Sequence, residues 1–217
     1  MKRWALLTIA LYVVILSLLV GPLLLAGFCP EISVKEIFSA YLNPAPWIWI
    51  GVMALAQAAL LVVPVRLAGE RPVAKRHVFW TILATIFLLL LMGAGIVFAG
   101  VETIGNTKWL DDDAIVLYVG IVGGVWCIWA FLMGFYVGGR EPKTLMQRVV
   151  RFLIAGSVLE LLVAVPTHIL ARMRNYCCAG FLTFWGIAAG ISVILLAFGP
   201  GVFLMFARRW KNKQPQT

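Results

Sequence analysis

Long runs of apolar residues are the feature that most restricts how this chain can fold. The hydrocarbon core of a bilayer is about 30 Å thick, so a helix needs about 20 apolar residues to cross it. Runs of about that length occupy residues 4–27, 46–66, 79–100, 114–137, 150–171 and 179–207. Backbone groups in lipid must be hydrogen-bonded within their own segment, which favours helices. We therefore expect an all-α, polytopic membrane protein, with residues 1–217 forming one domain of six transmembrane helices.

The overall composition agrees with this expectation. Hydrophobic residues make up 63% of the chain and charged residues 12%, whereas a soluble domain has about 45–50% and about 25%. The net charge is +9, but the basic residues occupy short loops between apolar runs and do not alternate with aromatic residues on a soluble face. We therefore expect contacts with the lipid bilayer and its anionic headgroups rather than with nucleic acid. A homo-oligomer or a partner in a membrane complex is compatible with this composition.

The first apolar run follows Lys2 and Arg3, as the apolar region of a signal peptide would. It is longer than the roughly 7–15 residues of such a region. Phe28 also stands where a lipoprotein cleavage site before Cys29 would need a small residue. We therefore expect an uncleaved first helix.

Basic residues divide unevenly between the two ends of the predicted helices. With six helices, the two termini and the second and fourth loops share one side, and they carry fourteen of the 18 Lys and Arg residues. The other side carries Lys35, Lys108, Arg172 and Arg174. Because cytoplasmic loops are enriched in Lys and Arg, we expect both termini to be cytoplasmic. The inner or plasma membrane of the cell is the expected location.

Two loops share a short sequence pattern. Residues 69–72 read Gly-Glu-Arg-Pro and residues 139–142 read Gly-Arg-Glu-Pro, and each tetrapeptide joins two apolar runs. The similarity suggests a tandem helical-hairpin repeat, as in transporters built from parallel repeats. The alternative is coincidence, because Gly and Pro are common in short turns.

Glu160 is an acidic residue in the middle of the fifth apolar run. A charged acid at the centre of a transmembrane helix costs about 2.5–3.5 kcal/mol on insertion scales, and such residues usually face the bundle interior. Positions one or two turns away share its helix face, and they are Gly156, Ala164, Thr167 and His168. We expect a polar stripe from mid-membrane to the outer surface, with a kink at Pro166.

Two interpretations of Glu160 remain open. It is either a group that takes up protons or cations along a path, or a neutral acid that makes one interhelical hydrogen bond. Burial in a medium of low dielectric constant favours the neutral form of a carboxyl group. The candidate partners in other helices are all uncharged, and they are Gln57, Thr81, Thr85, Thr183 and Ser192.

The loop after the fifth run departs from the charge pattern, because it carries Arg172 and Arg174 and no acid. One hypothesis pairs these arginines with acidic residues of the preceding outer loop, namely Glu102, Asp111, Asp112 and Asp113. The other has the arginines bind an anion, such as a lipid phosphate or an anionic substrate. If the protein is a carrier, Glu160, Thr167, His168, Arg172 and Arg174 would line its substrate path.

Three of the four cysteines fall on the predicted outer side, at Cys29, Cys177 and Cys178. An oxidising outer compartment would permit a disulfide between Cys29 and one of the other two. A catalytic alternative pairs Cys177 or Cys178 as a nucleophile with His168. No set of Cys and His residues has zinc-site spacing, and we expect neither a metal nor another cofactor.

Small residues predict where helices approach one another closely. Gly186 and Gly190 form a small-xxx-small step in the last run, which is typical of helix–helix contacts in membranes. In the same run, the sequence Gly-Pro-Gly at 199–201 is expected to bend or break the helix.

Motifs that would identify an enzyme are absent from the sequence: there is no phosphate-binding Gly-rich loop with a Lys, no HExxH pair and no GxSxG elbow. The preferred hypothesis is a small carrier or channel-like protein with a path from Glu160 to the outer His and Arg residues. The alternatives are a non-catalytic subunit or scaffold of a membrane complex, and a membrane-embedded thiol enzyme.

Overall fold

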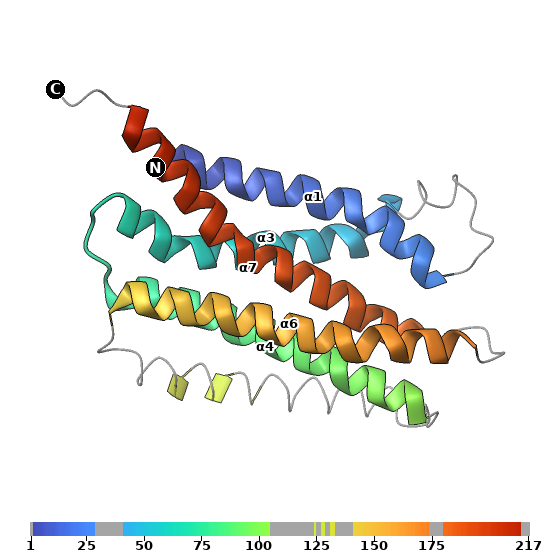
Figure 1. Ribbon diagram of the computed structural model, residues 1–217. Helices are drawn as coiled ribbons and strands as arrows, with labels where there is room; N and C mark the ends of the chain where they lie inside the picture. The colour runs from blue at the N-terminus through green and yellow to red at the C-terminus, as the bar shows by residue number, and fades with distance from the viewer. Residues whose placement is uncertain are drawn as a thin grey trace.

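The computed structural model describes residues 2–28, 41–104, 141–173 and 180–213, together with positions 124, 127, 128, 131 and 132. Within these ranges the chain is all-α (Figure 1). The helices are α1 (Lys2–Phe28), α3 (Pro44–Ala68), α4 (Lys75–Ile104), α6 (Pro142–Arg172) and α7 (Phe181–Lys213). Of these, α3, α4, α6 and α7 are long and apolar enough to cross a membrane. The chain is therefore a multi-pass integral membrane protein.

The number of helices differs from the prediction. The described part of the chain has five helices and four candidate membrane spans, not six. The predicted run 114–137 lies outside the described residues except at five positions. The first predicted run is helical in α1, which is not among the four candidate spans of the described residues.

The helices also extend beyond the apolar runs that predicted them. Helix α6 begins at Pro142, eight residues before the predicted start, and includes Lys143, Arg148 and Arg151. Proline suits the first turn of a helix, where its missing N–H group has no helical partner to lose. Hydropathy locates the part of a helix that lies in lipid, while backbone hydrogen bonding continues past the membrane surface.

Internal prolines do not interrupt the helices. Helix α3 continues through Pro64, α6 through Pro166 and α7 through Pro200. Of the predicted bend or break at residues 199–201, the break is wrong, because α7 is continuous from Phe181 to Lys213, and the bend remains a prediction. Transmembrane helices tolerate proline where neighbouring helices and small local adjustments compensate for the lost hydrogen bond.

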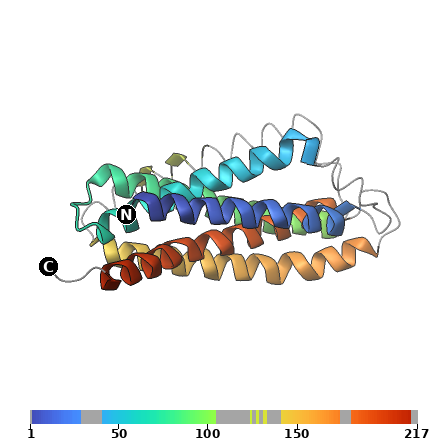
Figure 2. The same cartoon turned by 90° about the horizontal axis from the view of Figure 1, so that it is seen from above.

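Helix α7 is the central element of the bundle. It crosses between α1 and α3 on one side and α4 and α6 on the other (Figures 1 and 2), and it contacts all four. The main core contains fully buried side chains from these helices, including Met53, Leu88, Leu153 and Leu196. The most extensive contacts join α4, α6 and α7, so these three helices form the tightest part of the structure.

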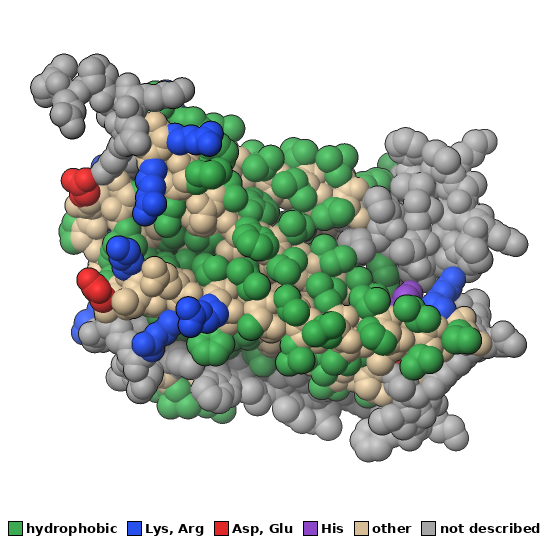
Figure 3. Space-filling model, in the orientation of Figure 1, with side chains coloured by type: hydrophobic (Ala, Val, Ile, Leu, Met, Phe, Trp, Pro, Cys, Tyr) green, Lys and Arg blue, Asp and Glu red, His purple; other side chains and the backbone are tan. Residues whose placement is uncertain are grey.

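The ends of the bundle differ in charge. Both termini, the turn between α3 and α4 and the start of α6 lie at the same end (Figures 1 and 2). Lys and Arg side chains gather at this end, whereas hydrophobic side chains cover the middle of the molecule (Figure 3). Near the middle of α6, Leu159 and Leu162 are exposed apolar residues. An apolar surface of this extent is typical of contact with a membrane or a protein partner.

Candidate functional site

Glu160 lies in the middle of α6, with its side chain fully buried. Neither of its carboxyl oxygens has a hydrogen-bond partner among the described residues. A Cβ added at Gly95 of α4 would overlap with Oε1, and one added at Gly190 of α7 would lie 3.1 Å from Oε2. The carboxyl group therefore occupies space that a side chain at Gly95 would fill, and it lies in tight contact with the position of a side chain at Gly190.

The same glycines bring the helices close together. A Cβ added at Gly186 of α7 would lie 3.1 Å from the carbonyl oxygen of Gly95 and 3.3 Å from Cβ of Ala164. Such short distances are typical of helix seams made by small residues in membranes. The predicted step at Gly186 and Gly190 thus lies in the contact with α4 and α6. Gly95 was not singled out from the sequence, although it forms a small-xxx-small step with Ala99, which is fully buried.

The hydroxyl groups considered as partners of Glu160 bond elsewhere. Thr81 donates to the carbonyl oxygen of Ala59 at 2.9 Å, an interhelical bond between α4 and α3. Thr85 donates to its own helix, and Ser192 does the same. Thr183 donates to the carbonyl oxygen of Gly180 at 3.0 Å. Ser and Thr commonly bond back to a preceding helical carbonyl in this way.

Gln57, the remaining candidate partner, forms a second buried polar site. Its side chain is fully buried in α3, and neither amide atom has a hydrogen-bond partner among the described residues. A Cβ added at Gly199 of α7 would overlap with Nε2 of Gln57. Gly190 and Gly199 are nine residues apart, which places them on opposite faces of α7. Helix α7 therefore contacts Glu160 through one face, at Gly190, and Gln57 through the opposite face, at Gly199.

A polar cluster holds the beginning of α7. Glu102 of α4 is buried, and its carboxylate accepts hydrogen bonds from the backbone N–H groups of Gly180 and Thr183, the latter at 2.8 Å. Free N–H groups and the helix dipole make such a terminus favourable for a carboxylate. Nδ1 of His168 in α6 lies 2.9 Å from Oγ1 of Thr183 and 3.1 Å from the carbonyl oxygen of Gly180.

Gly180 is required for this cluster in two ways. Its φ of +90° favours glycine. An added Cβ would also lie 2.9 Å from Cε1 of His168 and 3.0 Å from Cδ of Arg172. Arg172, in the last turn of α6, therefore lies against the same backbone that Glu102 and His168 contact.

The backbone hydrogen bonds of Glu102 are contacts that the sequence did not suggest, and its predicted pairing with Arg172 remains a prediction. Glu102 binds the start of α7 through the N–H groups of Gly180 and Thr183. Arg174, Asp111, Asp112 and Asp113 lie outside the described residues, as do Cys29, Cys177 and Cys178. The predicted ion pairs with these residues, the disulfide and the Cys–His pair with His168 therefore remain predictions. Cys127 is described, and it is a free, exposed thiol.

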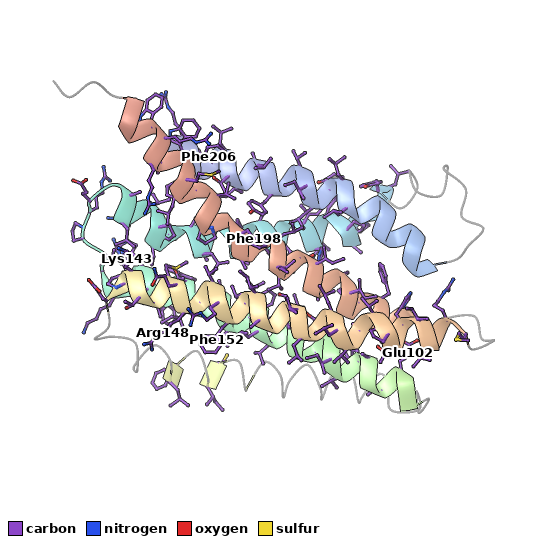
Figure 4. The ribbon with its side chains drawn as sticks, in the orientation of Figure 1. Glu102, Lys143, Arg148, Phe152, Phe198 and Phe206 are labelled. Atoms are coloured by element: carbon purple, nitrogen blue, oxygen red, sulfur yellow. The ribbon has the colours of Figure 1, made fainter. Side chains whose placement is uncertain are left out.

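Glu160 and the polar cluster lie at two different heights along the contact between α4, α6 and α7, which we call the three-helix seam. His168 follows Glu160 by eight residues, Glu102 follows Gly95 by seven, and Thr183 precedes Gly190 by seven. Each interval is about two helical turns, or roughly 10–12 Å along the axis. Glu102 lies near the end of α4, at the opposite end of the bundle from Lys143 and Arg148 (Figure 4). The polar cluster of Glu102, His168 and Thr183 therefore lies between Glu160 and the less basic end of the bundle.

Between the two levels lie small and weakly polar residues. Ala164 is fully buried, and Thr167 donates its hydroxyl hydrogen bond to the carbonyl oxygens of Val163 and Ala164 at 2.7 and 3.0 Å. On the other side of Glu160, Ser157 donates to the carbonyl oxygen of Leu153 and contacts the sulfur of Met92. The seam is therefore more polar toward the less basic end.

The described residues contain no group of three or more His, Cys, Asp or Glu side chains that could hold a metal ion. The chemistry that this part of the chain offers is that of one buried carboxyl group with a polar cluster two turns away. Comparison of the chain with known protein families, with curated proteins and with solved structures found no match.

Proposed function

We propose that the protein is a small membrane carrier that moves a proton or another cation, with Glu160 as the binding group. The observation that supports this proposal is the position of the Glu160 carboxyl group, which is fully buried without a hydrogen-bond partner among the described residues. Placing an acid at mid-membrane costs about 2.5–3.5 kcal/mol and is characteristic of ion pathways. A hydrogen bond to the carboxyl group would offset this cost, and it would have supported a purely structural role for Glu160.

In this proposal the path leads from Glu160 past Thr167 to His168, and Arg172 and Arg174 lie at its mouth. The polar cluster of Glu102, His168 and Thr183 supports a path on this side of the seam. Because Glu160 is completely buried, the proposal treats this arrangement as an occluded state. Loading and release then require the glycine seam between α4, α6 and α7 to open.

The proposal includes the orientation and a sixth crossing. Because Lys and Arg gather at the end that holds both termini, we propose that this end faces the cytoplasm. Helix α4 ends, and α6 begins, at opposite ends of the bundle (Figure 1). This arrangement supports a further crossing by the predicted run 114–137. The inner or plasma membrane of the cell is the proposed location.

Proton uptake into liposomes tests the role of Glu160. The purified protein is reconstituted into liposomes that contain a pH-sensitive dye, and the external pH is lowered while valinomycin and K⁺ compensate the charge. We expect Glu160→Gln to reduce uptake to the rate of protein-free liposomes, because an amide cannot bind and release a proton.

The matched control is Glu141→Gln, the same change at the exposed start of the same helix, where the side chain makes no capping hydrogen bond. This variant should transport like the unaltered protein. If Glu160→Gln and the unaltered protein show equal uptake of protons and of other cations, the carrier proposal is wrong.

A second candidate function is that of a non-catalytic subunit of a membrane complex. The observation that favours it is the apolar window of α6, of which 28% is buried, compared with 44–50% for the other three candidate spans. A partner helix would find an exposed apolar face there. Under this alternative Glu160 is a neutral packing residue, and its replacement by Gln should leave every flux unchanged.

A further inference from the structure

The space around the carboxyl group of Glu160 narrows the choice of substrate. We infer that the species bound by Glu160 is a proton and not a metal cation. This inference rests on the proposed carrier function and specifies its substrate. In each cycle one carboxylate oxygen would form an O–H bond with a proton from one aqueous side and release that proton to the other. No electrons are transferred.

The first argument is steric. A single carbon atom added at Gly95 would overlap with Oε1 of Glu160 and would lie 2.9 Å from Cα of Gly186. On the α7 side, a carbon added at Gly190 would lie 3.1 Å from Oε2 and 3.0 Å from Cγ of Leu161. On these two sides the carboxyl oxygens lie close against α4 and α7, which leaves no room there for a metal ion and its other ligands, whereas a proton adds almost no volume.

The second argument concerns ligands. Hard cations such as Ca²⁺ and Mg²⁺ bind six or more oxygen atoms at about 2.0–2.6 Å. Next to its two oxygens, at Gly95 and Gly190, the structure places glycine backbone and the side chain of Leu161. The hydroxyl groups of Thr183 and Ser192 on α7 bond to carbonyl oxygens of their own chain segment. The described seam therefore offers a cation the two carboxyl oxygens and few others.

The third argument concerns charge. Within the spans, α4 has no Lys or Arg between Arg76 and its end, and α7 has none between its start and Arg208. The nearest titratable groups toward the less basic end are His168 and Glu102, about two turns away. A buried carboxylate without a counter-charge is strongly destabilised. Binding one proton removes this charge completely, so the protonated acid is the form that fits the closed seam.

The experiment measures two kinds of flux with one preparation of the full-length protein in liposomes. Proton uptake is followed with the enclosed dye, and uptake of ²²Na⁺, ⁸⁶Rb⁺ and ⁴⁵Ca²⁺ is followed by filtration. We expect proton uptake that Glu160→Gln abolishes and Glu141→Gln preserves. Uptake of each metal ion should equal that of protein-free liposomes.

The outcomes separate this inference from the carrier proposal. Glu160-dependent uptake of a metal ion without acidification would overturn the inference and leave a cation carrier. If no flux depends on Glu160, both fail.

Infrared spectroscopy provides a measurement that does not depend on transport. The unaltered protein at neutral pH should show the carbonyl stretch of a protonated carboxylic acid, which Glu160→Gln removes and added Na⁺ leaves unchanged. Absence of this band would show an ionised Glu160 and would also overturn the inference.

Discussion

At the scale of single residues, the room for the Glu160 carboxyl group comes from missing side chains on the opposing helices. Gly95 and Gly190 contact its two oxygens from α4 and α7. Other glycines of the same helices have no such role, since nothing lies within 4 Å of a Cβ added at Gly93 or at Gly201. This contrast allows the seam to be tested by adding one methyl group at a time.

We expect Gly95→Ala to destabilise the protein by about 1–3 kcal/mol, the usual cost of overpacking a well-packed interior. The added methyl group would meet Glu160 and the backbone of Gly186, and that backbone cannot rotate away. The measurement is reversible unfolding in mixed micelles with increasing SDS, followed by circular dichroism.

Gly93→Ala is the matched control, two residues earlier in the same helix and in open space. It should leave the free energy of unfolding unchanged or raise it by up to about 1 kcal/mol, because Ala has a higher helix propensity than Gly. Equal effects of the two substitutions would contradict the packing described around Glu160.

The sequence was informative about Glu160 but not about its surroundings. An acid inside an apolar run predicts burial, because exposure to lipid is costly, and Glu160 is fully buried. Its lack of a partner depends on the register of α4 and α7 against α6. That register is set by contacts between residues far apart in the chain, such as Gly95 and Gly186. A single sequence does not contain it.

At the scale of elements, the start of α7 is capped by a carboxylate from another helix, α4. Glu102 of α4 accepts hydrogen bonds from the N–H groups of Gly180 and Thr183. These groups would otherwise lack acceptors within α7, because the first N–H groups of a helix have no helical partner. The contact joins the end of α4 to the start of α7 across 78 residues of chain.

We expect Glu102→Ala to lower the free energy of unfolding by about 1–3 kcal/mol, since it leaves buried N–H groups without their acceptor. Glu102→Gln should cost less, because an amide oxygen still accepts a hydrogen bond. Unfolding in SDS would measure the loss of stability. Hydrogen exchange at residues 180–183, followed by mass spectrometry, should become faster in the Ala variant.

Asn43→Ala provides a comparison at another helix start. The Asn43 side chain accepts a hydrogen bond from the N–H group of Ala45 at 3.0 Å, but this contact is exposed to solvent. Its loss should cost about 1 kcal/mol or less. Unchanged exchange at residues 180–183 in Glu102→Ala would contradict the role of Glu102.

Sequence patterns predicted the helices better than their ends and interruptions. Four apolar runs correspond to candidate spans, because helix is the structure that satisfies a backbone in lipid. Of the bend or break expected at residues 199–201, the break was wrong, since α7 continues through Pro200. The helix contacts α1, α3, α4 and α6, and this support from neighbours has no signature in the local sequence.

At the scale of the whole molecule, the bundle has one strongly basic end and one end that carries the polar cluster of Glu102, His168 and Thr183. Arg71, in the turn between α3 and α4, belongs to the basic end, and Met173, just after α6, belongs to the other (Figure 1). Both side chains are exposed. They are therefore suitable positions from which to determine the orientation in the membrane.

We expect a cysteine at position 173 to face the outside and a cysteine at position 71 to face the cytoplasm. The substitutions Met173→Cys and Arg71→Cys are made one at a time in a full-length chain whose four native cysteines are replaced. A membrane-impermeant maleimide should label position 173 in intact cells and position 71 only after permeabilisation. The parent without cysteine should not be labelled in either condition.

The expected result follows from the distribution of charge. Arg71→Cys removes one of fourteen basic residues from the predicted cytoplasmic side, so the excess that orients the protein persists. Labelling of position 71 alone in intact cells would reverse the proposed orientation. Labelling of both positions in intact cells would contradict their placement at opposite ends of a bundle that crosses the membrane. If position 173 faces outward, the polar cluster beside it lies on the outer side, and protons would reach Glu160 from there.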